Sequence, residues 1–150
     1  MTVRSELFVA EHAGALARAD ARDAGREPAP VPAADTLALA GIDALDLEVL
    51  GEITARAVEY GSGELELQEV DLDRESLVEL PPFLCEVLVE LGRAEDLELP
   101  SDVATEWASD EDLDVNPASA LPLVNAIVAL VTAASTSGRS VYLWTGPAAR

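Results

Sequence analysis

Three aspartates at alternate positions, Asp110, Asp112 and Asp114, have the spacing with which a calcium-binding loop presents its first oxygen ligands. An EF-hand loop also needs a glycine at its sixth position for the turn and a bidentate glutamate at its twelfth. Counted from Asp110, those two positions hold Val115 and Leu121, so the coordination sphere is not closed. The sequence therefore predicts a solvated acidic connector at this place and no EF-hand.

The single cysteine and the single histidine, Cys85 and His12, raise the question of a nucleophile–base dyad. No catalytic motif surrounds either residue, and Cys85 lies beside the apolar face of a predicted helix, where a thiol behaves as a small hydrophobic group. One cysteine and one histidine cannot build a zinc site of the usual Cys/His type within one chain. The motifs thus predict no catalytic residue, no metal site and no cofactor.

One enzymatic alternative stays open, because the chain contains 29 acids. Two carboxylates that share a cleft can act as general acid and base in hydrolysis. So many acids guarantee accidental neighbours, and the sequence alone cannot select a catalytic pair. A carboxylate-based hydrolase would need a cleft lined by converging acids and a few aromatic side chains.

The net charge of −20 is distributed unevenly along the chain. Residues 41–114 carry 23 of the 29 acids and only three of the nine arginines, and there is no lysine. Such a field repels phosphate backbones, which argues against direct nucleic-acid binding, and it attracts basic proteins. Two explanations remain: the acidity serves a partner, or it reflects a composition set by codon bias or a salty cytoplasm.

The amino-terminal half is predicted to form two helices joined by an extended connector. Residues 7–10 are predicted to form a first strand or the start of the first helix. That helix is predicted to continue to about Asp23. Three prolines within residues 25–34 predict the connector, because each proline restricts its own backbone and that of the preceding residue. The next helix is predicted to begin at Asp43, a capping residue, and to end before the glycines at 61 and 63.

In the carboxyl-terminal half, the apolar residues first recur at every second position, as in a strand, and later recur at helical spacing. Alternating leucines predict a strand over 64–72 with a bulge near Glu69, paired with a second strand over 76–80. The remaining elements follow in order: a turn at 73–75, a Pro-started helix at 83–91, a short helix capped by Ser101, an Ala-rich helix at 118–137 and a strand at 140–145. We expect a single α+β domain over 1–150, with a small, mostly antiparallel sheet packed against these helices.

The stretch 118–134 carries no charge and approaches the length needed to span a membrane. Pro122, Asn125 and the many alanines favour a buried central helix instead, in which Asn125 would need an internal hydrogen-bond partner. No secretory signal is visible near the amino terminus, and a single cysteine excludes an intramolecular disulfide. These features predict a cytoplasmic location without membrane association and leave the oligomeric state open.

Four segments together resemble a group of short acidic bacterial proteins of uncharacterised function. They are "GIDALDLEVLGEI", "SLVELPPFLCEVLVEL", "VATEWASDEDLD" and "GRSVYLW", which span about residues 37–145. The likeness lies in the Pro-started helix, the Trp-plus-acid segment and the final strand that ends in Leu-Trp. The resemblance implies one α+β domain and carries no activity and no functional residues with it.

Binding to a basic protein is the function that this pattern favours most, as in an immunity or antitoxin-type inhibitor. Acids would steer the encounter, and a large aromatic side chain would supply affinity. The predicted partner-binding residues are Trp107, Asp110, Glu111, Asp112 and Asp114. For Trp107, as for Tyr142 and Trp144, a role in the core is the competing interpretation. A nucleic-acid mimic, with carboxylates in place of phosphates, is a further alternative.

Overall fold

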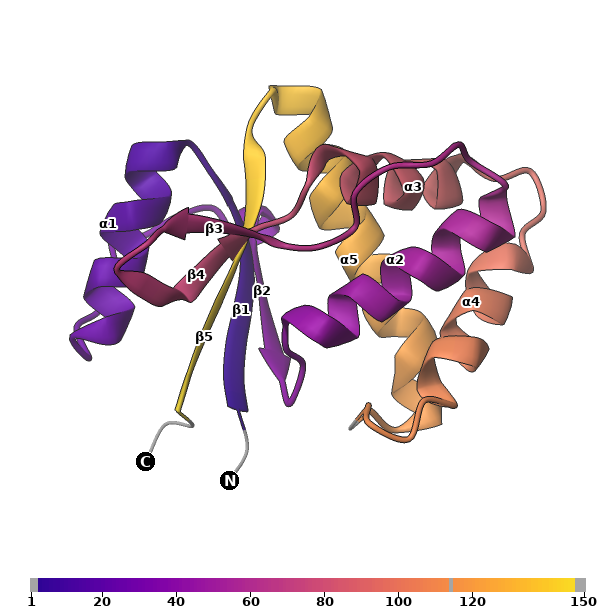
Figure 1. Ribbon diagram of the computed structural model, residues 1–150, viewed down its shortest axis with the longest axis horizontal. Helices are drawn as coiled ribbons and strands as arrows, with labels where there is room; N and C mark the ends of the chain where they lie inside the picture. The colour runs from indigo at the N-terminus through magenta and orange to yellow at the C-terminus, as the bar shows by residue number, and fades with distance from the viewer. Residues whose placement is uncertain (1–2, 114, 148–150) are drawn as a thin grey trace.

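A computed structural model describes residues 3–113 and 115–147 of the chain (Figure 1). The elements are β1 (Val3–Ala10), α1 (His12–Asp23), a 3-10 turn (Ala33–Asp35), β2 (Thr36–Ala40), α2 (Ala44–Val58), β3 (Gln68–Asp71), β4 (Arg74–Glu79), α3 (Pro82–Arg93), α4 (Leu99–Ala108), α5 (Pro117–Ser137) and β5 (Ser140–Pro147). The expected α+β class is confirmed: one antiparallel sheet is packed against helices that include the Ala-rich α5.

The five strands follow the order β2-β1-β5-β4-β3, and every neighbouring pair is antiparallel. At the centre, β1 and β5 pair over their whole length, from Val3 opposite Pro147 to Ala10 opposite Ser140. Strands β1 and β5 therefore lie side by side in Figure 1. This pairing joins residues 3–10 to residues 140–147, so the middle of the sheet is built from segments that are distant in the sequence.

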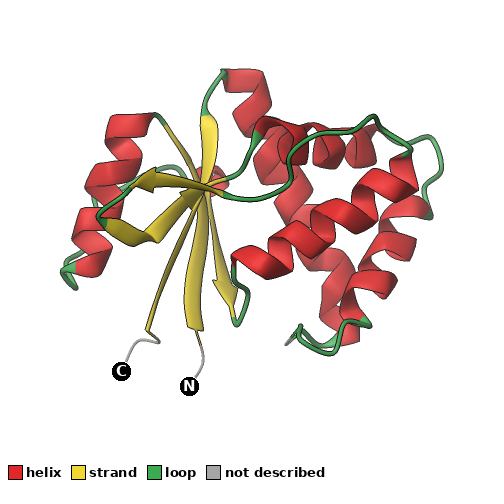
Figure 2. Cartoon of the chain, in the orientation of Figure 1, coloured by secondary structure: helices red, strands yellow, loops and turns green. Residues whose placement is uncertain are grey.

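Helices cover both faces of the sheet, as Figure 2 shows: α1 lies on one face, and α2, α3, α4 and α5 lie on the other. Successive strand side chains point to opposite faces. Leu7 and Leu143 accordingly enter the core beneath the four-helix side, whereas Phe8 and Tyr142 stack beneath α1 with ring centroids 5.7 Å apart. Because both faces are covered, residues 7–9 of β1 and residues 141–144 of β5 form apolar runs that are buried on both sides of the sheet.

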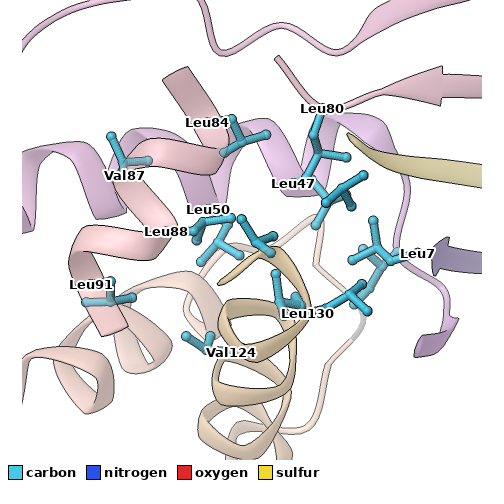
Figure 3. Packing of buried hydrophobic residues seen from close by; sticks show 14 of the residues in the cluster. Leu7, Leu47, Leu50, Leu80, Leu84, Val87, Leu88, Leu91, Val124 and Leu130 are labelled. Atoms are coloured by element: carbon cyan, nitrogen blue, oxygen red, sulfur yellow. The ribbon is translucent and has the colours of Figure 1, made fainter. Parts of the chain in front are cut away.

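The larger core lies between the sheet and the four helices. Its labelled side chains in Figure 3 come from β1, α2, α3, α5 and the end of β4: Leu7, Leu47, Leu50, Leu80, Leu84, Val87, Leu88, Leu91, Val124 and Leu130. Burying one such side chain contributes about 1.5–3 kcal/mol of transfer free energy. The helices approach closely at Gly51, where an added Cβ would lie 2.5 Å from Leu84 Cδ1. A larger residue at Gly51 would push α2 and α3 apart.

Local capping signals fix several helix ends where the sequence predicted them. Asp43 and Asp46 form a reciprocal capping box at the start of α2, with both side-chain-to-backbone hydrogen bonds at 3.0 Å. Pro82 stands in the first turn of α3. Gly138, with a φ of 70°, ends α5 in the left-handed conformation. The prediction that Ser101 caps α4 is wrong, because that helix already begins at Leu99.

The hairpin is confirmed, but its first strand is shorter than the predicted 64–72. Only Gln68–Asp71 pairs with β4, and the register shifts between Glu69 and Asp71, which confirms the bulge. The turn is the pair Leu72–Asp73 instead of 73–75. Residues 64–67 leave the ladder because Leu65 packs against Gly51 of α2.

Two further differences concern β2 and α5. The short strand β2 was not predicted; it is an edge strand held by its register with β1. Helix α5 buries one stripe, but Asn125 is exposed, so the expected internal partner for its side chain is wrong. By length and by a mean hydropathy of 1.8, α5 is a candidate membrane span, and a third of that apolar window is buried within the fold.

Candidate functional site: an acidic surface and a cleft

Trp107 does not reach the surface where a partner could contact it. Its side chain is 0% exposed, and its Nε1 donates a 3.0 Å hydrogen bond to the backbone carbonyl oxygen of Asp46. The indole fills the core between α4 and the first turn of α2. The competing core role is therefore the one observed, and the expectation that Trp107 anchors a partner is wrong for this conformation.

The acidic loop after α4 is present as predicted. Asp110 accepts a 2.9 Å hydrogen bond from the backbone N–H of Asp112, which tightens the turn, and both Glu111 and Asp112 are exposed. Asp114 lies outside the residues that the structure describes. We call Asp110, Glu111 and Asp112 the acidic loop.

The acidic loop lies near the start of α2, where Asp46 is largely buried. The pKa of Asp46 is raised to about 6, chiefly by burial and also by the charges of Asp43 and Asp110, against the lowering effect of the hydrogen bond from the Asp43 backbone. The sequence indicated Asp43 as a capping residue, but it did not indicate the reciprocal bond with Asp46 or the proximity of Asp46 to Asp110. That proximity depends on the packing of α4 against α2.

A second group of acids lies along the free edge of the sheet. Glu64, Glu66 and Glu69, which we call the β3 acidic edge, line a shallow depression of about 410 Å³. On the neighbouring helix, burial raises the pKa of Glu48, and the charge of Glu66 is the next largest cause. The carboxylates of this region therefore repel one another.

The arginines do not relieve this repulsion, because most of the paired ones face acids of the first 35 residues. Arg18 and Arg22 both bind the buried carboxylate of Glu6, with nitrogen–oxygen distances of 2.7 and 3.0 Å. These contacts tie α1 to β1 on the face opposite the four helices.

Arg74 belongs to the acid-rich segment, but it also pairs with α1. Its guanidinium binds Asp20 and Asp23, and Asp23 in turn accepts hydrogen bonds from Ser76 Oγ and from Trp144 Nε1, each at 2.9 Å. Arg139 similarly pairs with Asp35 at 3.0 Å. Among the described residues, the acids of 41–114 thus keep only two ion pairs within their segment, Arg56–Glu106 and the 3.7 Å contact Arg93–Glu90.

A cleft of about 380 Å³ opens where β4 leads into α3 and α5 leads into β5. Three glutamates line it, Glu79 from β4 and both Glu86 and Glu90 from α3, and Tyr60 lies in its wall. Its other walls are mainly apolar side chains from α3, α5 and β5. The sequence separates these acids by up to eleven positions and contains no signal that joins them to the end of α5.

Cys85 also lines this cleft, but its thiol is not activated. Burial raises its pKa to about 12, and the charges of Glu79 and Glu86 contribute to the rise. A thiol with this pKa is protonated at neutral pH and is a weak nucleophile. His12 lies on α1, across the sheet from α3, so the two residues do not form a dyad.

Within the described ranges 3–113 and 115–147, no three His, Cys, Asp or Glu side chains are grouped so that they could hold a metal ion. The acids instead spread over the acidic loop, the β3 acidic edge and the cleft. No protein-family model matches the chain, and no curated protein and no solved structure shows a significant similarity to it.

Proposed function

We propose that this chain is a non-catalytic, cytoplasmic protein-binding module that captures a basic partner, in the manner of an immunity or antitoxin-type inhibitor. The observation that supports it best is the distribution of ion pairs. The acids of 41–114 outnumber the cations of that segment by 23 to three, and one of those cations, Arg74, pairs with α1 instead. Apart from Glu106 and Glu90, the described carboxylates of the segment form no ion pair, so a cationic surface would relieve their repulsion.

The acidic loop and the β3 acidic edge are the surfaces that we assign to this partner. Glu111 and Asp112 are exposed, as are Glu64 and Glu69. Long-range attraction of this kind accelerates association and weakens as salt screens it, with a Debye length of about 10 Å at 0.1 M ionic strength. Burial is the largest cause of the raised pKa of Glu48, and the charges of Glu66, Asp43 and Glu52 add to it, which fits a region of carboxylates that repel one another.

The test is a pull-down from the native cytoplasm at low and at high salt, with three double variants. Glu64→Gln/Glu69→Gln removes charge from the β3 acidic edge, and Glu111→Gln/Asp112→Asn removes it from the acidic loop. Asp110 is left unchanged because its carboxylate accepts the hydrogen bond that shapes the turn. Glu11→Gln/Glu27→Gln, at two exposed positions outside the segment, is the matched control.

We expect a basic protein to be retained at low salt and released at high salt. The two surface variants should retain less of it, and the control should behave as the unmodified chain. Retention of no basic protein, or equal retention by all three variants, would contradict the proposal.

Carboxylate-based hydrolysis is a second candidate function, and the cleft is the observation that favours it. Its volume of about 380 Å³ falls within the size of small-molecule sites, and Glu79 and Glu86 reach it from different elements. Turnover of chromogenic glycosides or esters that is abolished in both Glu79→Gln and Glu86→Gln would support it. Turnover that persists in both variants would come from a contaminant or another site.

A further inference from the structure

The charged groups of the cleft are three glutamates and two arginines, and the hydroxyl-bearing residues Tyr60, Ser135 and Ser140 also line it. Two arginines lie in the wall, but Arg139 is held by Asp35 at 3.0 Å and by Ser137 Oγ at 3.0 Å. Arg93 is exposed and contacts Glu90 at 3.7 Å. In the described part of the chain, neither Glu79 nor Glu86 forms an ion pair. The cleft therefore carries uncompensated negative charge.

The end of α5 also borders the cleft, through Ala134 and Ser135 of its last turn. The carboxyl-terminal end of a helix carries a partial negative charge of roughly one half of an electron charge. Arg139 already lies at this end: its Nε donates a 3.0 Å hydrogen bond to Ser137 Oγ, and backbone N–H groups bind the carbonyl oxygens of Ala134 and Ser135. The attraction for a further cation therefore comes mainly from the glutamates.

Two neighbouring side chains respond to the charge of Glu79. Burial raises the pKa of Cys85 and of Tyr142, and for both groups the charge of Glu79 is the next cause. Of the two, only Cys85 lines the cleft, whereas Tyr142 is the register partner of Glu79 and stacks beneath α1. At Cys85 the charges of Glu79 and Glu86 create a negative potential, from which an anionic ligand would gain nothing.

The rest of the lining is apolar. Five lining residues form an apolar wall beside the glutamates, and each is at most 8% exposed: Leu80, Val89, Val131, Ala134 and Val141. A ligand that matches both parts combines a cationic head with an apolar stem. Guanidinium is the best match for two carboxylates on different elements, because its planar fork of donors can bind both at once.

We propose that this cleft binds an organic cation on a short apolar stem, a guanidinium in preference to an ammonium group. The cation has two possible sources, an arginine side chain of the basic partner or a free alkylguanidine. The first source rests on the proposed function; the second is independent of it. In both cases Glu79 and Glu86 bind the head and the apolar wall holds the stem.

The experiment is a titration of the isotope-labelled full chain, followed through its backbone amide NMR signals. The small probes are agmatine, which carries a guanidinium at one end of its stem and an ammonium group at the other, and 1,4-diaminobutane, which carries ammonium groups at both ends. The peptide probes are a blocked pentapeptide with arginine between glycines and the same peptide with citrulline, which keeps the shape of arginine without its charge. We expect agmatine and the arginine peptide to shift the signals of Cys85, Val89 and Ser135, 1,4-diaminobutane to bind more weakly than agmatine, and the citrulline peptide to leave the signals unchanged.

Two variants test the site by different means. Glu79→Gln removes one charge, and we expect it to weaken agmatine binding about tenfold, the order of a lost charge-assisted hydrogen bond. Ser135→Trp, at an exposed position, obstructs the cleft without changing its charge. Glu64→Gln/Glu69→Gln on the β3 acidic edge is the control and should bind agmatine as the unmodified chain does.

Several results would overturn the inference: equal binding of the citrulline peptide, shifts spread over all acidic regions, undiminished binding in both cleft variants, or no shift at tens of millimolar agmatine. Binding of agmatine without the arginine peptide would assign the site to a free alkylguanidine. If neither probe binds while salt-sensitive capture of a basic protein persists, the cleft inference fails and the proposed function stands. Cleft binding without any such capture would support the cleft inference and contradict the proposed function.

Discussion

The indole nitrogen of Trp107 donates a 3.0 Å hydrogen bond to the backbone carbonyl oxygen of Asp46, the residue whose carboxylate caps α2. One contact thus joins the last turn of α4 to the first turn of α2. Because the chain leaves α4 directly after Trp107, this contact also holds Asp110 near the buried carboxyl group of Asp46. The acidic loop owes its position to a core residue and not to its own sequence.

Replacing Trp107 with Phe should lower the free energy of unfolding by about 1–3 kcal/mol, because the Asp46 carbonyl loses its partner. Trp107→Ala should lower it by about 3–5 kcal/mol through the cavity that it leaves. Urea denaturation measures both values. A Trp107→Phe chain of unchanged stability that no longer captures a basic partner would instead restore the surface role for this residue.

Asp46 should make the chain less stable as the pH rises from about 4 to about 6. The folded chain holds the carboxyl proton up to about pH 6, whereas the ordinary pKa is 3.8, so the folded state binds more protons in this window. Asp46→Asn keeps an acceptor for the Asp43 N–H and should stabilise the chain at neutral pH by about 1–2 kcal/mol. Denaturation across the window checks this, with exposed Asp73→Asn as the control; a pH-independent gain would contradict it.

Glu6 should make the chain less stable as the pH falls, which is the opposite of the effect of Asp46. Burial raises its pKa, but the hydrogen bonds and charges of Arg18 and Arg22 outweigh that effect, so its folded pKa is lowered overall. Its contribution is present above the unfolded pKa and is lost as the pH falls through the folded value. Glu6→Gln should cost about 3 kcal/mol at neutral pH, because it leaves two arginine side chains without their partner. Denaturation should show the difference shrinking in acid; a constant difference would indicate packing alone.

Cys85 should resist alkylation in the folded chain. With a pKa of about 12 against about 8.5 for a free thiol, its thiolate fraction at neutral pH is lower by roughly three orders of magnitude. Iodoacetamide labelling followed by mass spectrometry should therefore be at least about 100-fold slower than in urea. Glu79→Gln should accelerate labelling and Glu64→Gln should not; the same rate in both would argue against the charge of Glu79.

Local signals in the sequence determined much of the secondary structure. The capping box at Asp43, the proline at Pro82 and the glycine at Gly138 each fixed a helix end, because each acts within one turn of its own position. The alternation before Asp71 similarly predicted a bulged hairpin. The uneven charge of the chain is a property of composition and needed no fold to be recognised.

Tertiary packing decided the rest. Edge strand β2 exists because β1 offers it a ladder, and Asn125 is exposed because the apolar stripe of α5 leaves its side of the helix uncovered. Trp107 became a core residue only when α4 packed against α2, and Glu79 and Glu86 came to line one cleft with the end of α5 only when α3 packed against α5. Caps and turns are decided by neighbours along the chain. Burial and the proximity of charges are decided by neighbours in space, and local residue spacing does not reveal which distant segments become such neighbours.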